Sequence, residues 1–533
     1  MRIRKLFTLA TFLCPLAFGA QALPPGKLLP KKSTPLPPEI QSVLNAIQPG
    51  NLRGNLSFLA SDALQGRYTP SPGLDVAAEF IASRFRASGL EPGGPEFFQV
   101  AHMIDRRLPR MQTEMTLEHG GGKSSVAAQT ITVLAVNRAS RIEHAPALVF
   151  PTRDPDLLKG KDISGKAVIS VQPDFEKLAS GEATEVYDKM SAFDAAVLSS
   201  DAAVEIIVVH GTTLEPESRL IPAEKAILTR PPQIQVNSEE LRNWVQHPSE
   251  GRFVSVQIPA PEDQKTAAKN VIGILRGSDP NLKNTCVLIT AHYDHIGTTE
   301  TAGHLAVPAK DQNNNDHIYN GANDDASGTV SVIEIATAIA RMNRRPKRSI
   351  VFMTFFGEER GELGSQYYAR HPVFPMTNTI ADVNLEQVGR TDSTTGPQVN
   401  TASLTGFDYS DLPRYFVNAG RETGVNVYLD KEGSDAYFLR SDNAAFAEEG
   451  VPAHTLTVAF DYPDYHGLGD EWQKIDYDNM ARVDRMIVLA LLRIANSTVA
   501  PLWNSNNPKT ASFRQAQKNS RTHKDGTYAN SIP

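Results

Sequence analysis

Residues 349–359 read S-I-V-F-M-T-F-F-G-E-E, an uninterrupted apolar run that ends in a glycine and two glutamates. Such a run is typical of a strand buried on both faces in the parallel sheet of an α/β domain. Open α/β sheets bind their ligands at the carboxyl ends of these strands. Glu358 and Glu359 therefore stand where a ligand site is expected, although Glu-Glu pairs more often lie on solvated helix faces. Outside a helix the two side chains point in different directions, so one can bind a metal while the other reaches a water.

A second strand-like run, V-L-I-T-A-H-Y-D-H at 287–295, also ends in polar residues. His292 and Asp294 are two positions apart and face the same side of an extended chain. A metal-binding imidazole usually donates its second N–H to a carboxylate or carbonyl, so Asp294 is expected to orient His292. Alone, His292 could equally be an ordinary histidine near a turn. His295 lacks a paired residue, and it is expected behind the ligands or at the surface.

Residues 320–328, N-G-A-N-D-D-A-S-G, place two adjacent acids between glycines, directly before a helical pattern at 328–341. Adjacent carboxylates repel each other unless a cation lies nearby. Asp324 and Asp325 therefore fit a metal site. Aspartate is also favoured at helix N-caps, and a solvated cap is the alternative.

Two further segments carry one candidate ligand each. The alternating run I-A-D-V-N-L-E-Q-V-G at 380–389 turns Glu386 away from its apolar face. The polar, aromatic loop at 461–472 follows a strand-like run at 453–460 and carries His466. An isolated loop histidine would mean little, so the interpretation depends on the whole set.

Together the motifs supply two imidazoles and three carboxylates, each beside a strand-like run: His292, Asp324, Glu359, Glu386 and His466. This set can give each of two divalent ions one nitrogen and one carboxylate, and leave one carboxylate to bridge them. Glu358 stays free to transfer protons. The pattern predicts a two-metal hydrolase site.

These motifs, together with R-S-D-N-A-A-F at 440–446, resemble the catalytic domain of the M28 family of zinc peptidases over residues 268–500. That family includes secreted bacterial aminopeptidases and relatives of glutamate carboxypeptidase. The resemblance implies an α/β fold, a three-layer α/β/α sandwich with a mixed, mostly parallel sheet, and two Zn²⁺ ions as cofactors. It implies that His292, Asp324 and Glu386 bind one zinc.

The resemblance also assigns the remaining roles. Asp324, Glu359 and His466 would bind the second zinc, so that Asp324 bridges the two ions. Asp294 would support the first histidine, and Glu358 would be the general acid and base. A cis peptide bond after Asp324 is implied as well.

Two residues depart from the family pattern. Glu386 stands where aspartate is commoner, and Asn443 stands where histidine is often found after Ser-Asp. The additional methylene of Glu386 could displace the first zinc. A catalytically inactive or differently metallated site is therefore the alternative.

The composition limits the setting. A formal charge of −7 argues against a nucleic-acid partner. The family resemblance implies peptides as the substrates. Residues 1–22 have a basic start, a short apolar core and an A-x-A end, which predicts a signal peptide and export to the periplasm or the exterior. No other segment is expected to span a membrane.

At 533 residues the chain is too long for a single core. Residues 23–134 are expected to form an N-terminal extension and the first part of the peptidase domain, and residues 266–503 its catalytic part. Between them, residues 135–265 contain short β runs and resemble a protease-associated (PA) domain, with an unrelated β-rich insert as the alternative. The polar residues 504–533 are expected to be disordered.

The favoured function is an exopeptidase that removes residues from the N-terminus of peptides. A carboxypeptidase of the glutamate carboxypeptidase type is the alternative, and it would need a nearby arginine, for which Arg390 and Arg440 are candidates. The same motifs would also fit a non-catalytic binding protein or a one-zinc glutaminyl cyclase.

Overall fold

The computed structural model describes residues 35–109, 112–174, 182–210, 218–225, 230–246, 251–307, 316–431 and 433–522. These residues divide into two compact units, one of residues 102–267 and one formed by the described residues before and after it. The predicted signal peptide, residues 1–22, lies outside the described residues.

The larger unit is built on a mixed sheet with the strand order β21-β20-β22-β17-β13-β16-β12. Its four central strands are parallel neighbours, whereas β12 runs antiparallel to β16 and β20 antiparallel to β22. This arrangement confirms the predicted sheet. The strands are β12 (Glu262–Leu275), β13 (Cys286–His292), β16 (Ser349–Phe355), β17 (Thr379–Leu385), β20 (Thr401–Leu404), β21 (Asn426–Tyr428) and β22 (Ala453–Thr457). Short strands are β1 (Glu91–Pro92), β14 (Gly297–Thr298), β15 (Ile318–Tyr319), β18 (Asp392–Ser393) and β19 (Gly396–Pro397).

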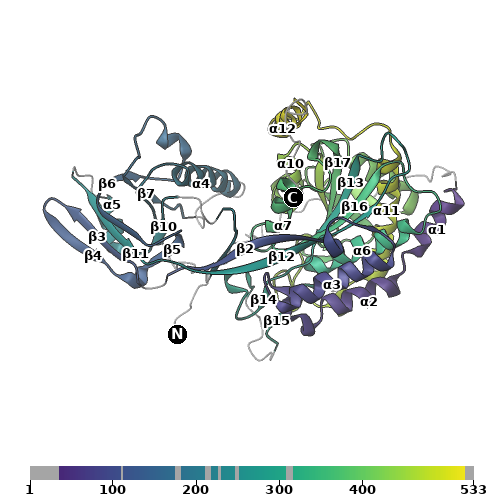
Figure 1. Ribbon diagram of the computed structural model, residues 1–533, viewed down its shortest axis with the longest axis horizontal. Coiled ribbons are helices and arrows are strands. Elements are labelled where there is room, and N and C mark those ends of the chain that lie inside the picture. Colours follow the sequence, from purple (N-terminus) through teal and green to yellow (C-terminus); the bar gives the residue numbers. More distant parts are fainter. Residues whose placement is uncertain are drawn as a thin grey trace. The chain divides into compact units, whose positions relative to one another are not determined.

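Helices cover both faces of this sheet, which completes the three layers (Figure 1). One group packs around α6: α1 (Pro38–Ala46), α2 (Pro49–Leu59), α3 (Pro72–Ala87), α6 (Ser327–Ala340) and α11 (Tyr477–Asn496), with α8 (Pro413–Thr423) on α11. The opposite group comprises α7 (Leu363–Arg370), α10 (Asn443–Glu448) and α12 (Ala511–Thr522), and α9 is a single turn at Gly433–Ala436. Strand residues Leu288 and Met353 share a core with Tyr368 and Phe446 of this second group.

The parallel strands determine where the connecting loops lie. A parallel pair needs a crossover connection, and α6 supplies it between β13 and β16 while α7 supplies it between β16 and β17. Because the central strands all point the same way, the loops that leave their carboxyl ends gather at one edge of the sheet. Residues from four such loops therefore meet there.

The C-terminal tail differs from the prediction. Residues 504–533 were expected to be disordered, but α12 forms within them and buries Phe513, whose ring stacks on Trp503 with centroids 5.0 Å apart. The prediction is wrong for residues 504–522, because one aromatic anchor holds a mostly polar helix on the core. The last eleven positions, 523–533, lie outside the described residues.

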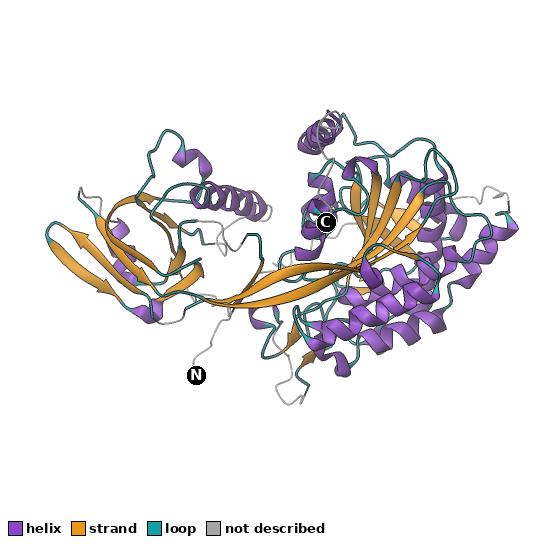
Figure 2. Cartoon of the chain, in the orientation of Figure 1, coloured by secondary structure: helices purple, strands orange, loops and turns teal. Residues whose placement is uncertain are grey.

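The smaller unit is dominated by strands (Figure 2). Its eight-stranded sheet has the order β4-β3-β11-β6-β7-β8-β10-β5. The strands are β3 (Glu114–His119), β4 (Gly122–Val126), β5 (Ile131–Ala135), β6 (Ser140–Phe150), β7 (Ala167–Val171), β8 (Val204–Val208), β10 (Gln233–Val236) and β11 (Phe253–Ile258); β2 (Phe98–Arg107) pairs with β9 (Ser218–Pro222). Helix α4 (Glu182–Leu198) packs Phe193 on Phe150 of β6, and α5 (Glu239–Gln246) contributes Leu241 to the core.

The predicted start of the β-rich insert at residue 135 falls inside this sheet. The unit begins at His102, because β11 pairs with β3 and places Val254 opposite Leu117 in one buried core. A start at residue 135 would remove three strands from the sheet. The likeness of this unit to a PA domain stays a prediction.

Helix α11 carries an unusual buried acid. Asp484 is fully buried, close to Ser331 and Glu334 of α6. Burial, reinforced by Glu334, raises the pKa of Asp484 to about 8.

Neither α11 nor another helix in the described ranges is long and apolar enough to cross a membrane.

We expect Asp484→Asn to make the protein more stable than the wild type, by a margin that grows with pH. Since the pKa is raised in the fold, the folded state keeps its proton while the unfolded chain loses it, so the wild type loses stability as pH rises from about 4 to about 8. The gap in Tm should widen by several degrees over this range, with both proteins at equal metal content. Parallel Tm curves across the range would show that Asp484 does not titrate in the folded state.

Candidate metal centre

The structure brings all five predicted ligands to one edge of the larger sheet. His292 ends β13, Glu386 directly follows β17, and Glu359 follows β16 after a short turn. Asp324 precedes α6, and His466 lies in the loop after β22. These positions lie far apart in the chain and meet because the strands that carry them are parallel neighbours.

The first group of ligands is centred on His292. Its Nε2 atom lies 3.3 Å from Oδ1 of Asp324 and 3.6 Å from Oε1 of Glu386. One ligand atom from each of the three residues lies within 4.8 Å of the others, and all three residues are buried. The longer side chain of Glu386 therefore still reaches the position where a first ion would bind.

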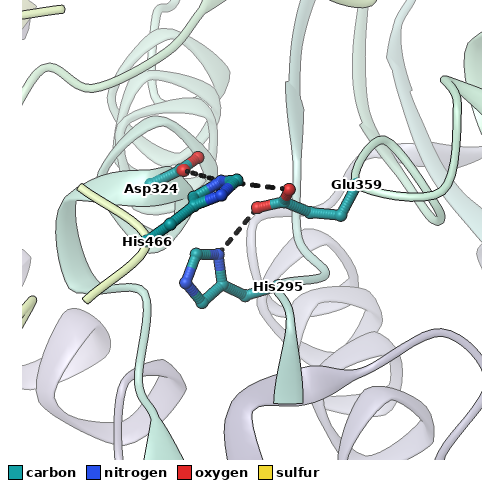
Figure 3. Close-up of side chains that lie close together, drawn as sticks. All are labelled: His295, Asp324, Glu359 and His466. Carbon is teal, nitrogen blue, oxygen red and sulfur yellow. Dashed lines mark hydrogen bonds and ion pairs between the residues drawn. The ribbon is translucent and has the colours of Figure 1, made fainter. Parts of the chain in front are cut away.

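The second group is centred on His466. Its Nε2 atom lies 3.2 Å from Oδ2 of Asp324 and 3.2 Å from Oε2 of Glu359. Figure 3 shows the His466 ring between these two carboxylates. Asp324 thus directs one oxygen toward His292 and the other toward His466, which is the geometry of a bridging ligand.

The donor atoms suit zinc. Within the described parts of the chain, the buried Nε2 atoms of His292 and His466 have no hydrogen-bond partner. Each Nδ1 instead lies near a main-chain carbonyl, that of Asp294 at 3.3 Å and that of Leu305 at 3.0 Å. A carbonyl accepts the Nδ1 proton and leaves a lone pair on Nε2, which is the arrangement found in metal-binding histidines. Imidazole and carboxylate are preferred ligands of zinc.

Three carboxyl groups of the site, those of Asp324, Glu359 and Glu358, differ in acidity. Burial would raise the pKa of Asp324, but His292 and His466 outweigh it and hold this pKa well below its usual range. Against the same effect of burial, His466 lowers the pKa of Glu359 to about 2. Burial raises the pKa of Glu358 well above its usual range, despite His292. The surroundings therefore favour the ionised forms of Asp324 and Glu359 and disfavour that of Glu358.

Asp294 supports the site in a way that differs from the predicted one. The His292 ring contacts the main-chain oxygen of Asp294, whereas the carboxylate lies 3.7 Å from Nδ1. That carboxylate accepts hydrogen bonds from the backbone N–H of Glu358 at 3.1 Å and from the hydroxyl of Thr69 at 3.0 Å. Asp294 therefore orients His292 through its main chain and fixes the position of Glu358 through its side chain.

His295 has a larger part in the site than the sequence indicated. It is fully buried, and its Nδ1 lies 2.8 Å from Oε1 of Glu359, toward which its ring turns in Figure 3. A ligand atom of His295 lies within 4.8 Å of those of the second group. Gly321 makes room for this ring, because a Cβ there would lie 2.4 Å from Cγ of His295. The surface alternative is wrong, because His295 is fully buried, whereas a position behind the ligands stays a prediction.

Sequence reasoning missed Asp470, which joins two ligand loops. Its buried carboxylate accepts hydrogen bonds from the backbone N–H groups of Asn323 at 3.0 Å and Asp324 at 3.1 Å, and from the Tyr462 hydroxyl at 2.9 Å. Asp470 lies in the same loop as His466, so it ties this loop to the bridging aspartate. Its spacing four residues after His466 was the available signal.

The two remaining sequence features have plain structural descriptions. The peptide bond between Asp324 and Asp325 is cis, as the resemblance implied. Asn443 begins α10, where its Oδ1 accepts a hydrogen bond from Thr455 at 2.8 Å and its Nδ2 donates to the Phe438 carbonyl at 2.8 Å. Asn443 thus holds the helix to the sheet.

Both candidate arginines of the carboxypeptidase alternative have other contacts. Arg390 is buried and pairs with Asp392 and, at 3.0 Å, with Asp464 in the loop of His466. Arg440 is exposed and lies over the ring of Tyr437. Arg390 therefore stabilises a ligand loop, and its charge is already balanced.

We expect His295→Asn to weaken zinc binding at the second group by about 10- to 100-fold, because Glu359 loses the ring that orients it. Binding at the first group should stay unchanged. Competition with a chromophoric chelator during stepwise zinc addition separates the two affinities. His454→Gln is the matched control, since His454 is equally buried but bonds Ser410 and the Thr405 carbonyl. Two unchanged affinities in His295→Asn would show that the ring is only a packing element.

Comparison with known proteins agrees with this geometry. Residues 270–491 match the family described as Peptidase family M28. A probable zinc metalloprotease of Pyrenophora teres f. teres (strain 0-1) is 27% identical over 301 residues, which cover 49% of this chain and 56% of that protein. Leupeptin-inactivating enzyme 1 of Streptomyces exfoliatus is 27% identical over 153 residues, covering 28% and 32% respectively. The matches thus span about half or less of these relatives.

A solved structure shares the fold. The aminopeptidase from Aneurinibacillus sp. strain AM-1 superposes with a TM-score of 0.52 at 18% sequence identity, over 87% of this chain and 97% of that one. Its likeness concerns the fold, whereas the family match covers the segment that carries all five ligands. The segment of residues 270–491 is therefore assigned to peptidase family M28.

Proposed function

We propose that the protein is a two-zinc aminopeptidase that hydrolyses the first peptide bond of peptides with a free N-terminus. The observation that carries the proposal is the placement of Asp324 between the Nε2 atoms of His292 and His466, with Glu358 beside them. This arrangement provides two adjacent binding positions and one carboxyl group outside both.

The reaction needs a proton carrier, and Glu358 has the required position. One of its carboxylate oxygens lies 3.9 Å from Nε2 of His292, and its side chain remains 13% exposed, so substrate and water can reach it. Zinc ions bound by the two groups would polarise the peptide carbonyl and lower the pKa of water. Glu358 accepts the proton of the attacking water and returns it to the leaving amine nitrogen.

The charge around the site favours a substrate with a positively charged end. Two further carboxyl groups, those of the half-buried Glu362 and the buried Asp442, interact electrostatically with Glu386. Burial and these like charges raise the pKa of Glu362 to about 8 and that of Asp442 to about 7. An α-ammonium group is stabilised in such surroundings, whereas a terminal carboxylate would need a cation. Since Arg390 is paired with Asp392 and Asp464, this supports cleavage at the N-terminus.

We expect Glu358→Gln to lower kcat by several orders of magnitude while the protein still binds two zinc ions, because the amide cannot carry the proton. Steady-state kinetics together with metal analysis tests this. Glu334→Gln is the matched control, because Glu334 is a buried glutamate that bonds Asn55 instead of facing the ligands. A Glu358→Gln enzyme with wild-type kcat would exclude this mechanism.

A set of three peptides distinguishes the two exopeptidase types. We expect hydrolysis of a peptide with a free amine and of its C-terminally amidated form, but none of its N-acetylated form. Product analysis should show release of the first residue, and removal of zinc with a chelator should abolish it. Cleavage of the acetylated peptide together with resistance of the amidated one would identify a carboxypeptidase instead.

A further inference from the structure

A short segment near the N-terminus, Gly66–Thr69, is buried against the metal centre. It lies outside the matched family region, 270–491, and precedes the β-rich unit in the chain. Arg67 is 1% exposed and Thr69 is fully buried. Their contacts are with the loops that carry the first ligands.

The guanidinium of Arg67 joins two of these loops. Nε donates to the carbonyl of Tyr293 at 2.8 Å, Nη1 to that of Asn320 at 2.7 Å, and Nη2 to that of Gly321 at 2.9 Å. A further bond runs from Nη1 to the Leu59 carbonyl at 2.6 Å. Every acceptor is a main-chain oxygen, so the side chain constrains the path of the backbone.

These acceptors stand next to the metal ligands in the sequence. Tyr293 directly follows His292, and Gly321 begins the turn that leads to Asp324. In return, the carbonyl of Arg67 accepts the backbone N–H of His295 at 3.3 Å. One planar side chain with a fixed fork of donors therefore sets the spacing between the His292 loop and the Asp324 loop.

Arg67 also places a positive charge behind the carboxylates. Burial lowers its pKa to about 10, against the opposing effect of Asp294, Asp470 and Asp324, so it stays charged at neutral pH. A buried carboxylate without a balancing charge is strongly destabilising. Arg67 supplies such a balancing charge close to Asp294, Asp324 and Asp470.

Thr69 acts on a different atom of the same site. Its hydroxyl donates to Oδ2 of Asp294 at 3.0 Å, while Oδ1 of Asp294 accepts the N–H of Glu358. The two bonds fix the carboxylate between them. Because the main chain of Asp294 contacts the His292 ring, a rotation of Asp294 would disturb both the ligand and the proton carrier.

The segment has no space in which to shift. Gly66 has φ +67°, and a Cβ there would lie 2.2 Å from the Gly297 carbonyl oxygen and 2.6 Å from that of Tyr319. Glycine is needed for this close backbone approach. The approach brings Arg67 and Thr69 within reach of the ligand loops.

We propose that Arg67 and Thr69 are positioning residues of the metal centre: Arg67 sets the distance between the His292 and Asp324 loops, and Thr69 fixes Asp294. The inference rests on the proposed two-zinc function. It predicts that zinc affinity depends on a segment that contributes no ligand and lies outside the matched family region.

Thr69→Val tests the inference most directly, since valine keeps the shape of threonine and removes only the hydroxyl. We expect zinc to bind the first group about tenfold more weakly, the usual effect of losing a partner that orients a ligand. Thr69→Ser should restore the affinity. The matched control is Thr337→Val on α6, because the Thr337 hydroxyl bonds the Ile333 carbonyl and Ser88.

Arg67→Lys keeps the charge but loses the fork of donors, and it should weaken binding at both groups. Affinities are measured by chelator competition on metal-free protein, and thermal unfolding of the same samples shows whether each variant is folded. Wild-type affinity in folded Thr69→Val overturns the inference, whether or not Arg67→Lys folds. A wild-type protein that binds fewer than two zinc ions would overturn the proposed function instead, so the two failures are distinguishable.

Discussion

The structure depends on one carboxylate, that of Asp324, which lies between two buried imidazoles. Its two oxygens face Nε2 of His292 at 3.3 Å and Nε2 of His466 at 3.2 Å. A buried carboxylate is stable only when positive charge or hydrogen-bond donors surround it. The two histidines lower the pKa of Asp324, and the carboxylate of Asp470 accepts a hydrogen bond from the backbone N–H of Asp324. The site is thus built around the need to keep one acid ionised inside the protein.

The parallel sheet makes this arrangement possible, and the groups around the ligands make it rigid. Because β13, β16 and β17 are parallel, His292, Glu359 and Glu386 at their carboxyl ends lie at a single edge of the sheet. Strand geometry alone fixes where each loop begins, whereas hydrogen bonds donated by Arg67 and accepted by Asp470 fix the path of its backbone. Such supporting contacts hold ligands within the small tolerance that metal binding requires.

The C-terminal segment and the start of the insert show where composition is a weak guide to structure. The polar C-terminal segment resembles a disordered tail, yet Phe513 stacks on Trp503 and anchors a helix. The insert begins earlier than its clearest β runs, because β3 completes the pairing of β11. In both cases a few apolar contacts decide the outcome, and an average over the segment hides them.

The sequence by itself determined the fold class and the five candidate ligands, because apolar runs ending in His, Asp or Glu predict both strands and the chemistry at their ends. It could not reveal that His295 contacts Glu359, that Asp470 holds the turn of Asp324, or that Arg67 bonds a carbonyl 226 residues away. Those contacts join side chains to backbone atoms of distant loops, and a main-chain carbonyl has no residue type to recognise. Only the tertiary structure, which brings the loops together at the edge of the sheet, decided which of the many buried polar groups support the metal centre.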